Sequence, residues 1–226
     1  MGTLSYQLSA RQSGDKVCYI LANDTVPQAK LDELAARYGV SFVNVYGFDW
    51  DNDLTPWPAP GVPKGTAPFK GFAPDLLTRL TGTLVPAAEH ALGLTGARRT
   101  LAGISLSGLF ATWQFMSDTT FANIISISGS FWYEGFVQWI EKAPFATRAP
   151  GAKAYFSLGV EEPRSSNRIF ATVGQCTPQV VDTIRRHGVD TCFQWNPGDH
   201  YAPFEPRLIR ALNHICLLYT SDAADE

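Results

Sequence analysis

The chain has no hydrophobic run long enough to cross a membrane and no cluster of basic residues. No segment reaches the roughly 18 consecutive apolar residues that a membrane-spanning helix needs. Lysine and arginine form nothing longer than the pairs Arg98–Arg99 and Arg185–Arg186, and the formal net charge is −3. A protein that binds nucleic acid along its backbone needs a basic surface that contacts the phosphates. We therefore expect neither a membrane nor a nucleic acid as the partner.

The sequence also lacks the motifs of common metal, redox and nucleotide sites. Its four cysteines are widely spaced and form no C-x-x-C pair, which argues against a zinc knuckle or a redox dithiol. H-E-x-x-H is absent, and so are the phosphate-binding patterns G-x-G-x-x-G and G-x-x-x-x-G-K-[ST]. We expect reduced, mostly buried thiols at positions 18, 176, 192 and 216 and no metal site.

The composition is that of an ordinary globular domain. The chain has 226 residues, of which 45% are hydrophobic and 17% charged. A single domain is the expectation at this length. The first residues contain neither a basic segment nor an apolar run that would serve as a signal peptide, so we expect a cytoplasmic protein.

The last eleven residues, 216–226, resemble one reading frame of a transposon-end adaptor used in DNA libraries. We set them apart from the fold as an artefactual tail, with a short acidic disordered tail as the alternative. Without Asp222, Asp225 and Glu226, the 21 acidic residues fall to 18 and equal the 18 basic ones. We therefore expect one domain over residues 1–215, with its natural C-terminus missing.

Short runs rich in β-branched and aromatic residues alternate with helical patterns. Between the first two runs, Leu31, Leu34 and Tyr38 have helical spacing, and Gly39 is suited to end the helix. Repeated strand–helix units predict an α/β fold, with a mainly parallel sheet and helices on both faces. The predicted strands cover residues 17–22, 41–46, 100–104, 123–127, 154–158 and 191–195.

One connection stands out by its length. Residues 49–75 lie between a predicted strand and its helix and include six prolines and two tryptophans. Connections in compact α/β domains are usually much shorter. We expect an ordered loop with a function.

A serine lies where a buried strand gives way to an apolar helix, in the segment 103–108. This context is typical of a nucleophile elbow, a sharp turn that strains the serine and lifts its hydroxyl above the sheet. Small residues two positions away on either side let the backbones approach. Gly103 supplies one of them, and Ser107 stands where the second glycine is usual. We expect Ser105 to be a nucleophile, with a tight structural turn as the alternative.

A serine hydroxyl needs a histidine base, and the chain offers four. His90 and His187 fall in helical segments, and His214 is near the end of the chain. His200 follows the last predicted strand, at the carboxyl edge where catalytic groups of open parallel sheets gather. This position favours His200 as the base.

The acid is expected between the serine and the histidine in sequence, since folds with a nucleophile elbow use the chain order serine, acid, histidine. Glu161 and Glu162 follow the penultimate strand, whereas Asp199 adjoins the histidine and breaks the order. Alternation along an extended chain points the two glutamates to opposite sides, so only one can approach the base. Pro163 restricts Glu162 to extended conformations, which favours it. Glu161, and a serine–histidine pair without an acid, are the alternatives.

Four segments carry a family resemblance: 101–110, 126–132, 158–163 and 197–200. They resemble the branch of the α/β-hydrolases that contains esterase D and the enterochelin-esterase-like enzymes, and the resemblance covers nearly all of residues 15–213. It implies the α/β-hydrolase fold, hydrolysis of a small-molecule carboxylic ester, and no metal or organic cofactor. It also places the nucleophile on Ser105 and the base on His200, and its L-G-x-x-E pattern favours Glu162.

Acyl transfer further needs N–H donors for the oxyanion and a pocket for the substrate. On this fold the donors are the backbone N–H of the residue after the nucleophile, here Leu106, and one from the loop after an earlier strand, here Asn23. Aromatic residues on two loops are expected to wall an acyl or aryl pocket, with packing onto the sheet as the alternative. They are Trp50, Trp57, Phe131 and Trp132.

The same fold supports other activities, because fold does not fix function. The alternatives to a serine esterase are an acyltransferase and a catalytically silent binding module. A nucleotide-binding α/β domain is the second architecture, and the missing phosphate motifs argue against it.

Overall fold

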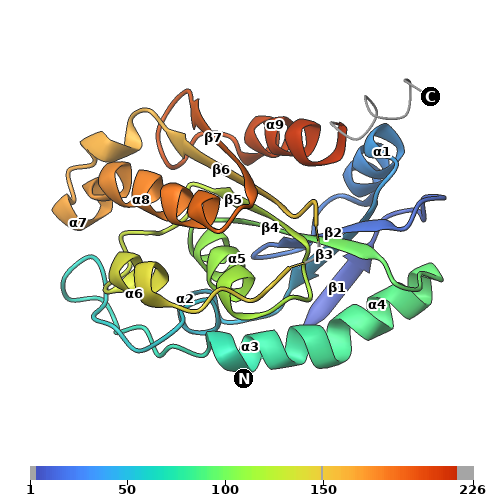
Figure 1. Cartoon of the computed structure of the whole chain (residues 1–226), viewed down its shortest axis with the longest axis horizontal. Helices are drawn as coiled ribbons and strands as arrows, with labels where there is room; N and C mark the ends of the chain where they lie inside the picture. The colour runs from blue at the N-terminus through green and yellow to red at the C-terminus, as the bar shows by residue number, and fades with distance from the viewer. Residues whose placement is uncertain (1–3, 149, 218–226) are drawn as a thin grey trace.

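A computed structural model describes residues 4–148 and 150–217. Within them the chain forms a seven-stranded sheet in the order β1-β3-β2-β4-β5-β6-β7 (Figure 1). β1 pairs antiparallel with β3, and the other neighbouring strands are parallel. The predicted mainly parallel sheet is therefore confirmed. The strands are β1 Ser5–Leu8, β2 Lys16–Leu21, β3 Ser41–Tyr46, β4 Arg98–Ile104, β5 Asn123–Ile127, β6 Lys153–Gly159 and β7 Asp190–Asn196.

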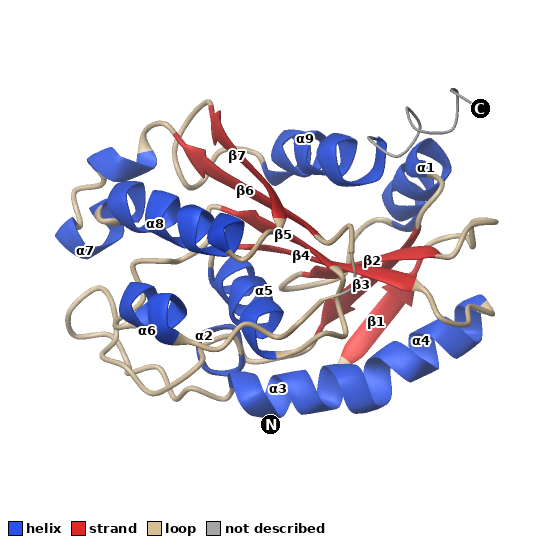
Figure 2. Cartoon of the chain, viewed as in Figure 1, coloured by secondary structure: helices blue, strands red, loops and turns tan. Residues whose placement is uncertain are grey.

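Helices cover both faces of the sheet. Successive residues of a strand point to opposite faces, so buried strands such as β2 have apolar side chains on both faces. In β2, Val17, Tyr19 and Leu21 belong to one buried cluster, and Cys18 and Ile20 belong to another. The second cluster is covered by α1 (Gln28–Tyr38) and α9 (Phe204–Leu217), on one side of the red strands in Figure 2. The first is covered by α3 (Ala73–Arg79), a π-helical turn (Leu80–Leu84), α4 (Val85–Leu92), α5 (Leu106–Ser117), α6 (Phe136–Lys142) and α8 (Val173–Arg186).

The six predicted strands match β2 to β7 with ends that differ by two residues at most. β1 is the strand that the sequence pattern does not reveal. It has four residues, Ser5–Leu8, and each is only half buried. Such a short edge strand buries too little apolar surface to leave a clear alternating pattern.

The long segment after β3 is held in place by contacts to distant parts of the chain. It begins with α2 (Trp50–Asp53). Asp53 is buried and pairs with Arg79 at 2.9 Å, and the Trp57 indole N–H donates to the Glu134 carbonyl oxygen at 2.9 Å. These contacts hold the segment in one conformation, as expected for an ordered loop.

Helix α9 includes the first two residues of the segment 216–226, which was set apart as an artefactual tail. Residues 218–226 lie outside the described residues. In the described ranges, no helix is long and apolar enough to cross a membrane. The four cysteines are free thiols, and Cys18 is fully buried while the other three are half buried.

Candidate active site

Ser105 occupies the sharp turn between β4 and α5. Its backbone angles are φ 58° and ψ −124°, a region that non-glycine residues rarely adopt. The Ser105 N–H donates to the Ile127 carbonyl oxygen at 3.0 Å, and the Ser105 carbonyl accepts from Ser130 N–H at 3.1 Å. A Cβ atom at Gly103 would lie 2.4 Å from backbone atoms of Ser107. The elbow therefore needs glycine at 103, and neighbouring backbone groups hold its strained serine.

His200 lies on the turn after β7 and faces Ser105. Its Nε2 atom is 3.1 Å from Ser105 Oγ, and its Nδ1 atom is 2.9 Å from Glu162 Oε2. An ionised carboxylate only accepts hydrogen bonds, so Nδ1 carries a proton and donates it to Glu162. The neutral imidazole then has its lone pair on Nε2, where it accepts from the serine hydroxyl.

Glu162 begins the 3-10 helix Glu162–Arg164 that follows β6, and its side chain is 4% exposed. Its Oε1 accepts from the Ser128 hydroxyl at 2.5 Å and from Gly159 N–H at 2.7 Å. Burial alone raises the pKa of Glu162, but the hydrogen bonds from His200, Ser128 and Gly159 outweigh it and lower the pKa below its ordinary value. Glu162 is therefore ionised at neutral pH and can orient the imidazole.

The other two candidate acids line the same cavity, but the imidazole Nδ1 bonds Glu162. Glu161 and Asp199 are exposed, and Asp199 Oδ1 accepts from Tyr201 N–H at 2.9 Å. The expected extended conformation at Glu162 is wrong, because Glu161 has helical angles and the chain turns at once into the 3-10 helix. This turn buries Glu162 and leaves Glu161 in solvent.

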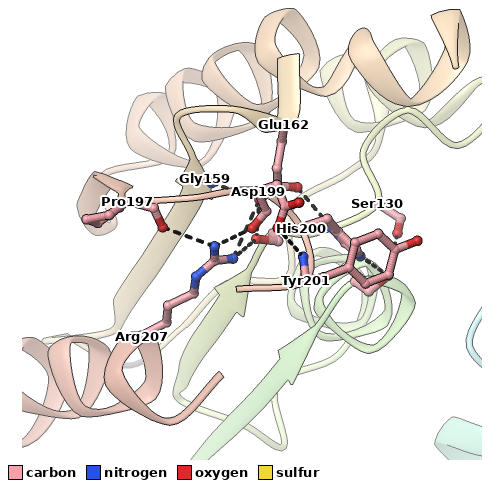
Figure 3. Close-up of polar contacts among 10 residues, drawn as sticks. Ser130, Gly159, Glu162, Pro197, Asp199, His200, Tyr201 and Arg207 are labelled. Atoms are coloured by element: carbon pink, nitrogen blue, oxygen red, sulfur yellow. Dashed lines mark hydrogen bonds and ion pairs between the residues drawn. The ribbon is translucent and has the colours of Figure 1, made fainter. Parts of the chain in front are cut away.

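Three residues of the site were not among those that the sequence analysis singled out. Ser128 has a positive φ of 48° and bonds Glu162, and Ser130 Oγ lies 3.3 Å from Ser105 Oγ. Arg207, on α9, is 2% exposed and lies 3.7 Å from Glu162 Oε1 (Figure 3). The first two serines belong to the segment 126–132 that carries the family resemblance, so their position was a usable signal.

A cavity of about 510 Å³ opens over Ser105 and His200. Trp50 and Trp132 line it, as expected for a substrate pocket. The expectation that Trp57 and Phe131 also line the pocket is wrong. Phe131 is 1% exposed and packs in the core, and Trp57 packs in a cluster of aromatic rings. The remaining aromatic lining residues are Phe69, Phe170 and Tyr201.

The two expected oxyanion donors have different positions. Leu106 lines the cavity, and as the first residue of α5 it has an N–H without a partner inside the helix. Asn23 is exposed and does not line the cavity. Its loop bonds β3 and β1, on the side of the sheet away from β6 and β7, because Asn44 donates to the Asp24 carbonyl at 3.1 Å and Gln7 Oε1 accepts from Val26 N–H at 2.8 Å.

No arrangement in the described residues suggests a metal centre. No group of three or more His, Cys, Asp and Glu side chains is placed there to hold a metal ion.

Comparisons with known proteins identify the fold. No family model matches the chain. It is 29% identical to uncharacterized protein YbbA of Bacillus subtilis (strain 168), over 73% of this chain and 68% of that protein. The IroE-like serine hydrolase of Shewanella oneidensis superposes with a TM-score of 0.74 at 15% identity, covering 96% of this chain and 80% of that one. The chain has the α/β-hydrolase fold.

Two further α/β-hydrolase structures superpose along almost their whole length. Siderophore hydrolase EstB of Aspergillus nidulans has a TM-score of 0.73 at 17% identity, with 94% of this chain and 90% of that one covered. The enterobactin and salmochelin hydrolase IroE has a TM-score of 0.66 at 19% identity, with 96% and 94% covered. The predicted resemblance to enterochelin-esterase-like enzymes is thus confirmed in the fold.

Proposed function

We propose that the protein is a serine carboxylic-ester hydrolase, with Ser105 as nucleophile, His200 as base and Glu162 as the acid of a catalytic triad. One observation carries the proposal: the hydrogen-bonded series from Glu162 through His200 to Ser105, at 2.9 and 3.1 Å. The fold shared with an IroE-like serine hydrolase and a siderophore hydrolase supports it.

The geometry allows the usual two half-reactions of acyl transfer. Ser105 Oγ attacks the ester carbonyl while its proton passes to His200 Nε2, and Glu162 stabilises the imidazolium that forms. The Leu106 N–H is placed to donate to the oxyanion of the tetrahedral intermediate. The imidazolium then protonates the leaving alcohol as the C–O bond breaks. Water repeats the sequence on the acyl-enzyme and releases the acid.

The substrate we propose is a small-molecule ester, since the cavity has about 510 Å³ and aromatic walls. Every step above uses groups of this chain, so we propose no metal or organic cofactor. We further propose action in the cytoplasm, where the four free thiols would stay reduced.

Covalent labelling tests the nucleophile directly. A fluorophosphonate probe is expected to label the wild-type protein and not Ser105→Ala, and Ser105→Ala and His200→Ala should each lose most hydrolysis of nitrophenyl acetate and butyrate. Ser166→Ala is the matched control, because Ser166 lines the same cavity and is exposed. An unlabelled wild type would indicate a silent binding module. Formation of a new ester when an alcohol competes with water would indicate an acyltransferase.

A further inference from the structure

A buried guanidinium lies behind the proposed triad. Arg207 is 2% exposed on α9, one of the largest fully buried side chains in the described part of the chain. A buried arginine is costly unless its charge and its donors are satisfied. The contacts of Arg207 therefore show which groups compensate the cost of burying its charge.

The guanidinium joins three segments that each carry part of the site. Its Nη1 donates to Ser128 Oγ at 2.9 Å and lies 3.7 Å from Glu162 Oε1. Its Nη2 donates to the carbonyl oxygens of Pro197, at 3.4 Å, and Asp199 (Figure 3). Pro197 and Asp199 belong to the turn that carries His200. One side chain thus ties the turn after β5, the acid after β6 and the histidine turn after β7.

The direction of the bonds in this cluster follows from donor chemistry. A guanidinium has no acceptor, so Ser128 Oγ must accept from Arg207 and give its own proton to Glu162 Oε1. With Gly159 N–H also on Oε1, that oxygen is fully occupied, and Oε2 faces the His200 Nδ1–H. The cluster fixes which carboxylate oxygen meets the imidazole.

The surrounding backbone leaves little freedom for this arrangement. A Cβ atom at Gly159 would lie 2.5 Å from the Gly198 carbonyl oxygen and 3.1 Å from that of Asp199. The histidine turn therefore packs closely against the end of β6, and the guanidinium bonds the Pro197 and Asp199 carbonyl oxygens of the same turn.

We propose that Arg207 is a positioning residue that holds Glu162 and the His200 turn in register through its planar fork of donors. This inference rests on the proposed esterase function. Lysine keeps the charge and has three N–H donors, but all three are on one nitrogen. It therefore does not reproduce the two separate nitrogens by which Arg207 bonds Ser128 and the two carbonyl oxygens. The fork geometry, beyond the positive charge, is what the site uses.

The experiment compares Arg207→Lys with the wild type by kcat, KM, the pH profile of kcat/KM, and Tm. Loss of such a supporting residue is expected to lower kcat by about 10- to 100-fold with little change in KM. The acidic limb of kcat/KM should move to lower pH, because an imidazolium without a well-placed carboxylate loses its proton more readily. The matched control is Arg210→Lys, one turn later on α9, whose Nη1 bonds Asn196 Oδ1 at 2.7 Å and which should behave as wild type.

A double-mutant cycle separates positioning from mere stability. In a Glu162→Gln background, Arg207→Lys should lower kcat by a smaller factor than it does in the wild type, because the part of its effect that passes through Glu162 is already lost. If Arg207→Lys folds poorly, Ser128→Ala removes the shared hydroxyl and should move the limb in the same direction. Two results would overturn the positioning role while leaving the esterase function in place. One is a wild-type kcat and a wild-type acidic limb in Arg207→Lys, and the other is a loss of kcat by Arg207→Lys that is equally large with and without Glu162→Gln. An inactive wild type that no fluorophosphonate labels overturns the esterase function itself.

Discussion

Ser107 Oγ accepts a hydrogen bond from the Ile104 N–H at 2.8 Å and donates to the Ile104 carbonyl oxygen, also at 2.8 Å. This serine stands where nucleophile elbows usually have a glycine, and its hydroxyl ties both polar groups of the residue before Ser105. Only Gly103 meets backbone atoms too closely to carry a side chain there. The departure from G-x-S-x-G is therefore compatible with the elbow.

The first prediction concerns the two hydrogen bonds between Ser107 and Ile104. Ser107→Gly should keep esterase activity within about 10-fold, since the strained turn remains, and should lower the free energy of unfolding by about 1 to 2 kcal/mol through the lost bonds and the flexible glycine. Thermal melting and nitrophenyl butyrate turnover measure the two effects. Abolished turnover in Ser107→Gly together with normal turnover in Ser105→Ala would place the nucleophile at 107.

The second prediction assigns the acid. Glu162→Gln should lower kcat by about three to four orders of magnitude, because an amide cannot stabilise the imidazolium and favours the wrong tautomer. Glu161→Gln is the matched control, and its exposed side chain should make it nearly silent. Two silent substitutions would point to a serine–histidine pair oriented without this carboxylate.

The third prediction concerns acid stability. The pKa of Glu162 is lowered in the folded protein, so its ionised form stabilises the fold above the ordinary glutamate pKa of about 4.3, and this contribution disappears as the pH falls through the lower folded value. The difference in unfolding free energy between wild type and Glu162→Gln should therefore shrink on acidification. Chemical denaturation from neutral to strongly acid pH measures it, and a difference that stays constant would contradict the lowered pKa.

The fourth prediction distinguishes two tryptophans that the sequence analysis assigned to the substrate pocket, Trp57 and Trp132. Trp57 donates to Glu134 and stacks 6.3 Å from Phe136, so Trp57→Ala should cost about 3 kcal/mol of stability with unchanged acyl selectivity. Trp132 lines the cavity, 4.8 Å from the Phe170 ring, so Trp132→Ala should change selectivity across acyl lengths. Melting temperatures and relative rates on acetate, butyrate and hexanoate esters distinguish the two. Changed selectivity in Trp57→Ala alone would reverse the assignment.

The placement of Ser105, His200 and Glu162 was predictable because their strands are parallel. β4, β6 and β7 end at the same edge of the sheet, so residues that follow each strand meet although they are 38 and 95 positions apart. Local sequence patterns locate the strands, and the fold then brings the three residues together.

The remaining parts depend on contacts that no local pattern encodes. Asn23 does not line the cavity, and Asn44 and Gln7 bond its loop to β3 and β1, away from β6 and β7. By its local pattern Arg207 is one more residue on an amphipathic helix, and only the packing of α9 against β5 and β6 directs it at Ser128. Long-range hydrogen bonds of this kind set loop paths and buried polar clusters, so sequence periodicity does not predict them.

The last prediction follows from the charges around the cavity. Its described lining includes the exposed carboxylates of Asp51, Glu161 and Asp199, and neither lysine nor arginine occurs among the described lining residues. Arg207 is buried beneath the site and paired with Glu162, so it offers little attraction to a substrate. A negative potential should disfavour anionic esters relative to neutral ones, and aromatic walls favour cations further.

Three nitrophenyl esters with acyl chains of equal length test this selectivity: hexanoate, adipate with its free carboxylate, and trimethylammonio-hexanoate. After correction for their hydroxide-catalysed rates, kcat/KM for the adipate should be about 10-fold below the hexanoate at low salt, and the gap should narrow as salt screens the field. At low salt, Asp51→Asn combined with Glu161→Gln should reduce the difference in kcat/KM between hexanoate and adipate. Asp182→Asn, which removes an exposed carboxylate on α8, should leave that difference unchanged. Equal rates on all three esters at low salt would mean that the lining carboxylates do not act on the substrate, because a charge that touches the bound acyl chain must separate the three.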